Sequence, residues 1–182
     1  MAFQAHHDSI QAETGTTPED SVEEMWAAFL AARPGLAPPG ATWSAWHFCD
    51  NPPDADKLAD LVLAGRKRAT ASALWSYEAE DEPMPQVGDL SVITDWMGRA
   101  RCVIRTSLVE VVAFADVGDD FAAAEGEGDG SLEFWREAHL AAFGRELEAL
   151  DRSPSPDMPV VCERFEVVFP VVDGPASPGR DA

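Results

Sequence analysis

Three runs of strand-forming residues limit the folds that are open to this chain of 182 residues. The longest run covers residues 101–112, where β-branched side chains are frequent and two sets of residues alternate as on the two faces of a strand. Residues 90–94 and 160–169 have a similar composition. We expect the three runs to be neighbouring parts of one curved sheet or barrel.

Helical patterns are inserted among these runs. Thr17-Pro18 supplies the hydroxyl cap and the first-turn proline with which a helix begins. A second helix is expected after Asn51, with Gly65 in the left-handed conformation that closes it. A third helix is expected from the cap Ser131 to Leu150.

Shorter elements complete the expected order. Residues 43–48 and 71–77 are predicted to be strands, and residues 121–124 a short helical piece. Short strands with helices between them predict an α+β domain built on a small, partly closed β-barrel, with an extra helix at its N-terminus.

One domain is expected over residues 17–172, because the length suits one core and not two. Residues 1–16 have no hydrophobic periodicity and are predicted to be disordered, and residues 173–182 are predicted to be a flexible tail. No apolar run approaches the roughly 18 residues of a membrane span, and the N-terminus lacks the apolar core of a signal peptide. No membrane association is therefore expected.

The cysteines indicate a reducing compartment. Cys49, Cys102 and Cys162 are an odd number at wide spacing, and no pair has the spacing of metal ligands. We predict free thiols in the cytoplasm, and we predict neither a metal site nor a cofactor.

Charge restricts the class of partner. The formal net charge is -20, yet residues 66–105 carry six basic and six acidic side chains. The whole molecule should repel a long nucleic acid, whereas a small ligand or a short strand can still enter a locally neutral mouth. The charge pattern favours a pocket over an extended polynucleotide groove.

The stretch at 63–77 concentrates the candidate chemistry. Lys67, one of two lysines in the chain, lies between Arg66 and Arg68, and Thr70 follows three positions later. A lysine can act as a base if burial or neighbouring cations lower its pKa, and a threonine hydroxyl needs such a base before it can attack. Without further support, this cationic run after a helix is more typical of a solvated cap.

The order of several motifs resembles the ASCH (activating signal cointegrator homology) domain over residues 43–172. The resemblance is carried by Gly65-x-Lys67-x-x-Thr70, Val87-Gly88-Asp89, a long basic strand, Phe121-Ala122-x-x-Glu125-Gly126 and a closing strand. The phrases at 125–129 and 159–165 are similar to those of a longer bacterial subgroup. The resemblance implies a barrel fold related to the PUA RNA-binding domain.

The resemblance also implies a candidate site. A small bacterial branch of the superfamily hydrolyses the amide of N4-acetylcytidine with a lysine, a threonine and a glutamate, which by motif would be Lys67, Thr70 and Glu125. Glu127 and Asp129 compete with Glu125 for the role of the acid. These residues are expected to border a common cleft, although this chain is longer than the short deacetylase.

Five further residues are candidates for substrate contact. Arg66 and Arg68 flank Lys67, and Trp75 and Tyr77 have rings that can stack on a nucleobase, although aromatic residues in strands are more often core. Ser131 is a candidate as well, but a helix cap is its simpler role. His139, in the middle of a helix, is interpreted as structural.

Two classes of function remain open. The first is a hydrolase acting on a modified nucleoside or a short RNA. The second is a non-catalytic PUA-like module that binds RNA. A ribonuclease acting on single-stranded RNA is a further alternative, because other relatives are described as ribonucleases. A deep pocket that encloses Lys67, Thr70 and Glu125 would favour the hydrolase, and a shallow basic face would favour the binding module.

Overall fold

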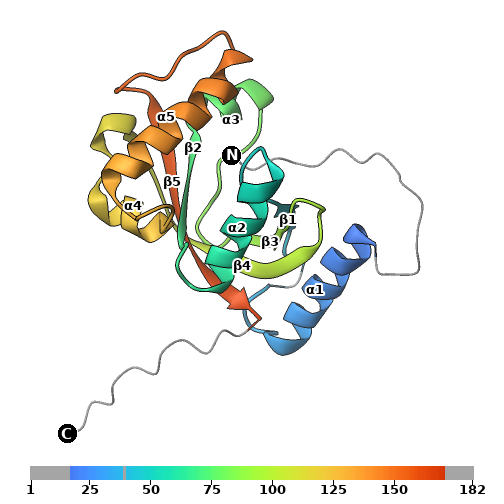
Figure 1. Ribbon diagram of the computed structural model, residues 1–182. Helices are drawn as coiled ribbons and strands as arrows, with labels where there is room; N and C mark the ends of the chain where they lie inside the picture. Colours follow the sequence, from blue (N-terminus) through green and yellow to red (C-terminus); the bar gives the residue numbers. More distant parts are fainter. Residues whose placement is uncertain (1–16, 39, 171–182) are drawn as a thin grey trace, which may run out of the picture.

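The computed structural model describes residues 17–38 and 40–170. The predictions for residues 1–16 and 173–182 lie outside this part of the chain. In chain order the elements are α1 (Pro18–Ala32), β1 (Trp43–Trp46), α2 (Pro52–Leu63), β2 (Ala69–Ala73), α3 (Leu74–Glu80), β3 (Leu90–Thr94), β4 (Ala100–Ala113), the 3-10 helix η1 (Phe114–Asp116), α4 (Asp119–Glu125), α5 (Leu132–Glu148) and β5 (Pro159–Phe169) (Figure 1).

The five strands form one sheet in the order β1-β3-β4-β5-β2. The three runs that were expected to be neighbours are adjacent, as β3, β4 and β5, and the prediction of an α+β fold is confirmed. β1 pairs with β3 in parallel, and the remaining pairs are antiparallel. Since β1 and β2 lie at opposite edges, the sheet is open and a closed barrel is not confirmed.

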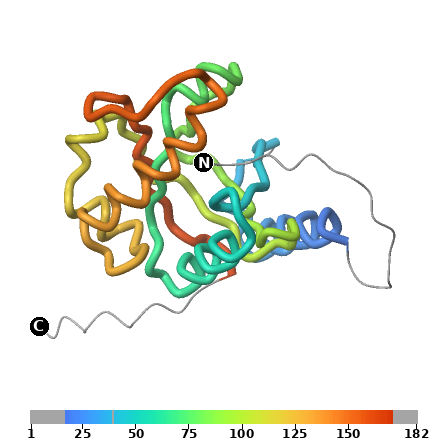
Figure 2. The backbone as a smooth tube through the Cα atoms, turned by 45° about the horizontal axis from the view of Figure 1, so that its top comes forward, coloured from blue at the N-terminus to red at the C-terminus, as the bar shows by residue number. Residues whose placement is uncertain are grey.

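Helices cover both faces of β3 and β4. Val92 and Val103 pack with Phe29 of α1 on one face, whereas Ile93 and Ile104 pack with α2 on the other. The alternation follows from the two-residue period of a strand. Two views place α1 on the opposite side of the molecule from α4 and α5 (Figures 1 and 2).

The other end of the sheet is covered by α4 and α5. The small side chains of β2 (Ala69, Ala71 and Ala73) let the bulky Trp135 and Phe143 of α5 approach the strand, and all five are buried in one cluster. This arrangement places α5 opposite α2, with β2 between the two helices.

The strand predicted at 71–77 differs from the structure. β2 ends at Ala73, and the chain continues as α3, so Trp75 and Tyr77 lie on a helix. Ala73 pairs with Val160, one residue after β5 begins at Pro159, whose nitrogen cannot donate to a ladder. The strand therefore has no partner along which to continue. The predicted strand at 43–48 is likewise shorter, ending at Trp46.

Candidate functional site

The end of α2 turns Lys67 inward. Gly65 has φ +69, and the amide groups of Gly65 and Arg66 donate to the carbonyl groups of Val62 and Leu61. This is the Schellman arrangement that closes a helix. The chain leaves it extended, so Arg66 and Arg68 are exposed while Lys67 is only 1% exposed.

The end of α4 brings the acidic residues to Lys67. The Arg68 amide donates to the Ala124 carbonyl at 2.7 Å, which joins the start of β2 to the last turn of α4. Gly126 then reverses the chain with φ +64, and a Cβ there would lie 2.4 Å from the Arg66 carbonyl oxygen. The close backbone approach thus requires glycine, and it places Glu125 and Glu127 on either side of the turn.

Lys67 is held by two carboxylates. Its Nζ donates to Oε1 of Glu127 at 2.6 Å and lies 3.7 Å from Oε2 of Glu125. Glu125 is completely buried, whereas Glu127 is 22% exposed. The Nζ also lies 5.0 Å from the centre of the Phe48 ring, at a distance typical of a cation–π contact.

The charges fix the protonation of this pair. Burial alone would lower the pKa of Lys67, but Glu125 and Glu127 outweigh it and hold the pKa above its ordinary value. Burial alone would raise the pKa of Glu127, but the Lys67 ammonium holds it below its ordinary value. At neutral pH the pair is an ammonium and a carboxylate. This differs from the lowered lysine pKa that a general base requires.

His139 is the fourth polar group of the cluster. Its Nδ1 donates to the Trp135 carbonyl oxygen at 2.9 Å, and its ring stacks on the Trp135 ring at 4.2 Å between centroids. Its Nε2 therefore faces Oε2 of Glu125 at 3.3 Å. Neither oxygen of Glu125 has a hydrogen-bond partner among the described residues, so Lys67 and His139 lie close to it without acting as aligned donors.

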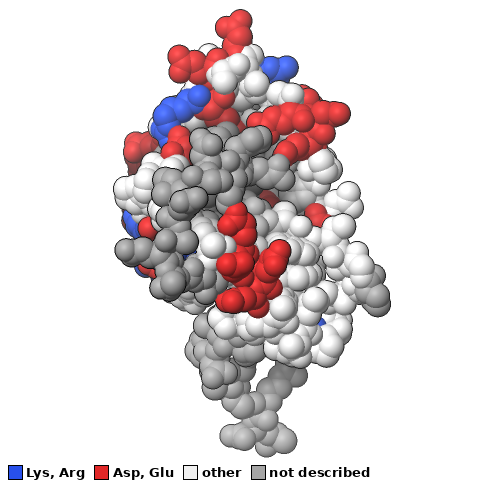
Figure 3. All heavy atoms as spheres, turned by 90° about the vertical axis from the view of Figure 1, so that its right-hand side faces the viewer, with Lys and Arg blue, Asp and Glu red and all other residues white. Residues whose placement is uncertain are grey.

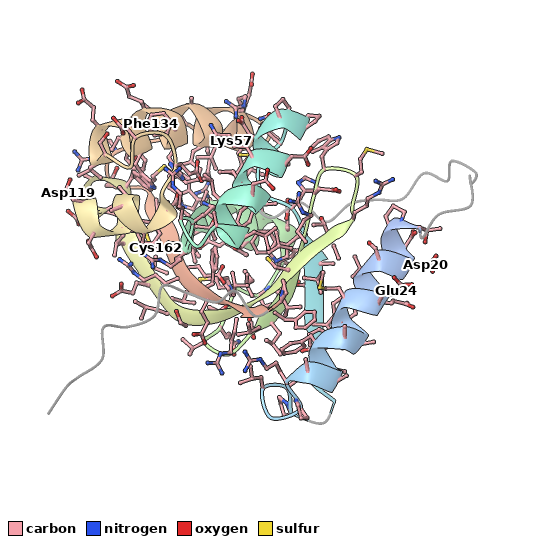
Figure 4. All side chains as sticks on the ribbon, turned by 60° about the horizontal axis from the view of Figure 1, so that its bottom comes forward. Asp20, Glu24, Lys57, Asp119, Phe134 and Cys162 are labelled. Carbon is pink, nitrogen blue, oxygen red and sulfur yellow. The ribbon has the colours of Figure 1, made fainter. Side chains whose placement is uncertain are left out.

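A cavity of about 200 Å³, the Lys67 cavity, opens between α2 and α5. Its polar lining includes Lys67, Thr70, Glu127 and His139. Lys57 of α2 and Phe134 of α5 also line it, and Figure 4 shows both on the same side of the molecule. Further residues that line the cavity are Phe48, Cys49, Asp50, Asp54, Gly128, Phe143, Arg145 and Glu146. This volume suits a nucleobase-sized group.

The structure gathers part of the predicted site. Lys67 and Thr70 border the Lys67 cavity together, and Glu127 borders it in the position where Glu125 was expected. Glu125 contacts Lys67 from behind and does not line the cavity. The predicted lysine and glutamates do converge, but Glu127 is the one that a ligand can reach.

The other predicted contacts lie elsewhere. Arg66 and Arg68 line neither cavity of the described residues. Trp75 packs against the α5 core, with the Arg152 guanidinium 4.5 Å from its ring centre. Ser131 accepts a hydrogen bond from the Phe134 amide as the cap of α5. Tyr77 lines a second cavity.

This second cavity, the Glu163 cavity, has a volume of about 540 Å³ and lies between β1 and β3 on one side and β2, β5 and α3 on the other. Thr70 lines both cavities. Sequence reasoning did not find Glu163 as a site residue, because a lone acid in a strand gives no local signal.

Sequence reasoning also assigned His139 a structural role. Its position on the inward face of α5 was predicted, but its proximity to Glu125 depends on the packing of α4 against α5. Only the helical spacing of His139 from Trp135, which supplies the carbonyl that orients the ring, was visible in the sequence.

Acidic side chains predominate on the side of the molecule that carries α1 (Figures 1 and 3). Figure 3 shows acidic side chains far outnumbering basic ones on one face of the molecule. Asp20 and Glu24 are exposed on α1, and Figure 4 shows both on the outer side of that helix. Of the basic strand residues, Arg101 pairs with Asp60 at 2.5 Å and Arg105 pairs with Glu166. These ion pairs occupy two of the arginines that a basic binding face would need.

Three further observations concern the described residues alone. No group of three or more His, Cys, Asp or Glu side chains among them is arranged to hold a metal ion. None of the described helices combines the length and apolar composition needed to cross a membrane. The three cysteines are free thiols.

Comparisons with known proteins agree with the fold. The family profile of the ASCH domain matches residues 44–169. The crystal structure of an ASCH domain from Lactobacillus crispatus is 38% identical, with a TM-score of 0.78, over 82% of this chain and 94% of that one. The crystal structure of a protein from Enterococcus faecalis, which is 34% identical in sequence to this chain, has a TM-score of 0.71. The match covers 82% of this chain and 88% of that one. No curated protein matches this chain.

The open five-stranded sheet with its covering helices, together with the profile match over residues 44–169, defines the class of this domain. The chain belongs to the ASCH domain family, as its motifs predicted. The PUA-like fold that the resemblance implied is supported as well.

Proposed function

We propose that this ASCH domain is a hydrolase that cleaves an amide bond in a modified nucleoside, with the chemistry in the Lys67 cavity. The observation that carries the proposal is the enclosed set of an ammonium, a reachable carboxylate, a hydroxyl and an imidazole around one small volume. Burying a pair of charges has a desolvation cost, and apolar residues of similar volume can often fill such a site with equal stability. The presence of the charged pair in a cavity therefore favours a chemical role.

The protonation states assign the roles. The Glu127 carboxylate accepts a proton from water, whose oxygen forms a bond with the acyl carbon. The Lys67 ammonium stabilises the oxyanion that develops there. When the carbon–nitrogen bond breaks, the proton held by Glu127 passes to the leaving nitrogen. The products are a carboxylic acid and an amine, and both side chains return to their starting states.

Glu125 and Thr70 have supporting roles in this scheme. Glu125 lies behind Lys67 and positions the ammonium. Thr70 borders the cavity, and no described side chain hydrogen-bonds its hydroxyl, so no base is in place to make it a nucleophile. We assign Thr70 to substrate positioning, which differs from the nucleophilic role that the family resemblance implied.

A panel of N-acylated nucleosides, free and within short RNAs, tests the proposal. Glu127→Gln keeps an acceptor for Lys67 but removes the base, and it should lower kcat by about 10²–10⁴-fold on the best substrate. Glu133→Gln, an exposed acid in the first turn of α5, is the matched control and should leave kcat unchanged. If no amide in the panel is cleaved, the hydrolase is excluded, and full turnover by Glu127→Gln would exclude Glu127 as the base.

RNA binding without catalysis is the second candidate, because ASCH domains belong to a PUA-like fold that is often linked to RNA. Arg66 and Arg68, which are exposed and flank Lys67 in the chain, favour it. Their replacement by Met should then weaken the binding of a short single-stranded RNA and reduce its salt dependence, with no effect on the hydrolysis of a free nucleoside.

A further inference from the structure

The Glu163 cavity has a lining that differs in kind from that of the Lys67 cavity. Three carboxyl groups border it, those of Glu82, Asp89 and Glu163, and no Lys, Arg or His does so among the described residues. Three aromatic residues share the same lining, Trp43, Trp46 and Tyr77. The cavity is therefore short of positive charge and has apolar walls.

Glu163 is the buried carboxyl group of this lining. The side chain belongs to a residue only 8% exposed, and its Oε1 accepts the Thr106 hydroxyl at 2.6 Å. No described residue donates a hydrogen bond to its Oε2, although the side chain borders the open volume. A carboxyl oxygen that borders a cavity, on a largely buried side chain, can accept a hydrogen bond from a ligand in that cavity.

The surroundings of Glu163 favour the approach of a cation. Burial raises the pKa of Glu163, and the Asp89 carboxylate raises it further against the opposing hydrogen bond from Thr106. Tyr77 and Glu82 are the other titratable groups that border the cavity, and neither brings a positive charge. A bound cation would remove this deficit.

We propose that the Glu163 cavity is a binding subsite for an aromatic organic amine, with the ammonium group at Glu163 and the ring against the aromatic walls. Carboxylates and aromatic rings both attract such a ligand, the first by a charge-assisted hydrogen bond and the second by stacking or cation–π contact. A phosphate or carboxylate ligand would meet three like charges.

Thr70 connects this subsite to the Lys67 cavity, where the proposed reaction takes place. Only this step of the inference rests on the proposed function. Because Thr70 lines both cavities, a single ligand can extend from Lys67 to Glu163 past the edge of β2. Amide hydrolysis produces an acid and an amine. The Lys67 ammonium suits the acyl group of the substrate, and the Glu163 cavity suits the part of the substrate that carries an amine.

A matched series of three probes tests binding without any turnover. 2-Phenylethylamine is a cation, 2-phenylethanol is its neutral counterpart and 3-phenylpropionate is an anion of similar shape. Titration calorimetry at neutral pH should show the amine binding about 10-fold or more tightly than the alcohol, with no binding of the anion. Equal affinities for the amine and the alcohol would overturn the proposal.

Variants locate the bound amine. Glu163→Gln should weaken amine binding by about 10-fold or more while leaving the affinity for the alcohol unchanged. Glu110→Gln removes the same charge from an exposed position on β4 that does not border the cavity, and it should have no effect. Unchanged amine affinity in Glu163→Gln would overturn the proposal.

A second variant at the rim guards against misfolding of the first. Glu82 lies in the exposed loop after α3, and Glu82→Gln should weaken amine binding by a smaller factor than Glu163→Gln does. Because the assay needs no reaction, amine binding without amide cleavage would reject only the hydrolase. Cleavage without amine binding would reject only this subsite.

Discussion

At the scale of single residues, the site is a balance between burial and paired charge. Lys67 would lose its proton easily in an apolar pocket, and the two carboxylates prevent this. The same ammonium keeps Glu127 ionised. The pair thus supplies both a cation and a base at neutral pH, a combination that neither residue would provide alone.

This balance predicts the pH dependence of kcat. Glu127 acts as a carboxylate, and because its pKa lies below its ordinary 4.5, the base is lost only as the pH falls below about that value. Lys67 acts as an ammonium, and because its pKa lies above 10.5, the charge is lost only in strong alkali. We expect a flat pH–rate profile through neutrality. A profile that rises across pH 7 with a lysine-dependent step would instead indicate a lysine base.

The buried pair also predicts a strong coupling in stability. Lys67→Met leaves Glu125 buried without a cation, and it should lower the free energy of unfolding by about 3–5 kcal/mol. Adding Glu125→Gln should recover part of that loss, because the orphaned charge is removed. Chemical denaturation of the two single variants and the double variant measures the coupling, and simple additivity would contradict it.

An exposed ion pair serves as the control for this cycle. Arg145 and Asp50 pair at 3.1 Å across the rim of the Lys67 cavity, with side chains 57% and 35% exposed. Arg145→Met should cost less than about 1 kcal/mol, because water screens such a pair.

At the scale of elements, the site depends on where two helices end. α2 closes at Gly65 and α4 closes at Gly126, and the backbone contact between these two turns carries Lys67 to Glu127. The distance of 60 positions in the sequence is bridged by main-chain geometry rather than by the side chains themselves.

The Gly126 turn supports a prediction on stability. Gly126→Ala should lower the free energy of unfolding by at least about 2 kcal/mol, because it combines left-handed strain with a clash against the Arg66 carbonyl. Gly144→Ala, inside α5 with φ outside the left-handed region and open space at its Cβ, should instead raise it by about 0.5–1 kcal/mol. Denaturant midpoints measure both, and a neutral Gly126→Ala would contradict this role of the turn.

These turns explain how much could be predicted from sequence. The end of α2 was predictable because Gly65 is a local signal, and that end is what buries Lys67. The end of β2 was not, because it depends on where β5 begins, 86 positions after Ala73. The choice between Glu125 and Glu127 was open for a similar reason: the last turn of α4 decides which one faces the cavity.

At the scale of the whole molecule, the open sheet and the acidic surface act together. The edge strands β1 and β2 do not pair, and the Glu163 cavity lies between them and their neighbours. The chain as a whole carries a formal net charge of -20. Long-range electrostatics therefore disfavours anionic ligands, while the enclosed sites favour small ones.

This charge predicts how a phosphate on the substrate affects its binding. For a nucleoside amide that is cleaved, adding a 5′-phosphate should raise KM, because the ligand must approach a strongly negative molecule. The increase should shrink between about 0.05 M and about 0.5 M salt, since the screening length falls well below the size of the protein. Steady-state kinetics on the matched pair of substrates measures both effects. A 5′-phosphate that lowers KM, with an advantage that salt removes, would show that local arginines outweigh the net charge, and Arg66 and Arg68 would then be the residues to test.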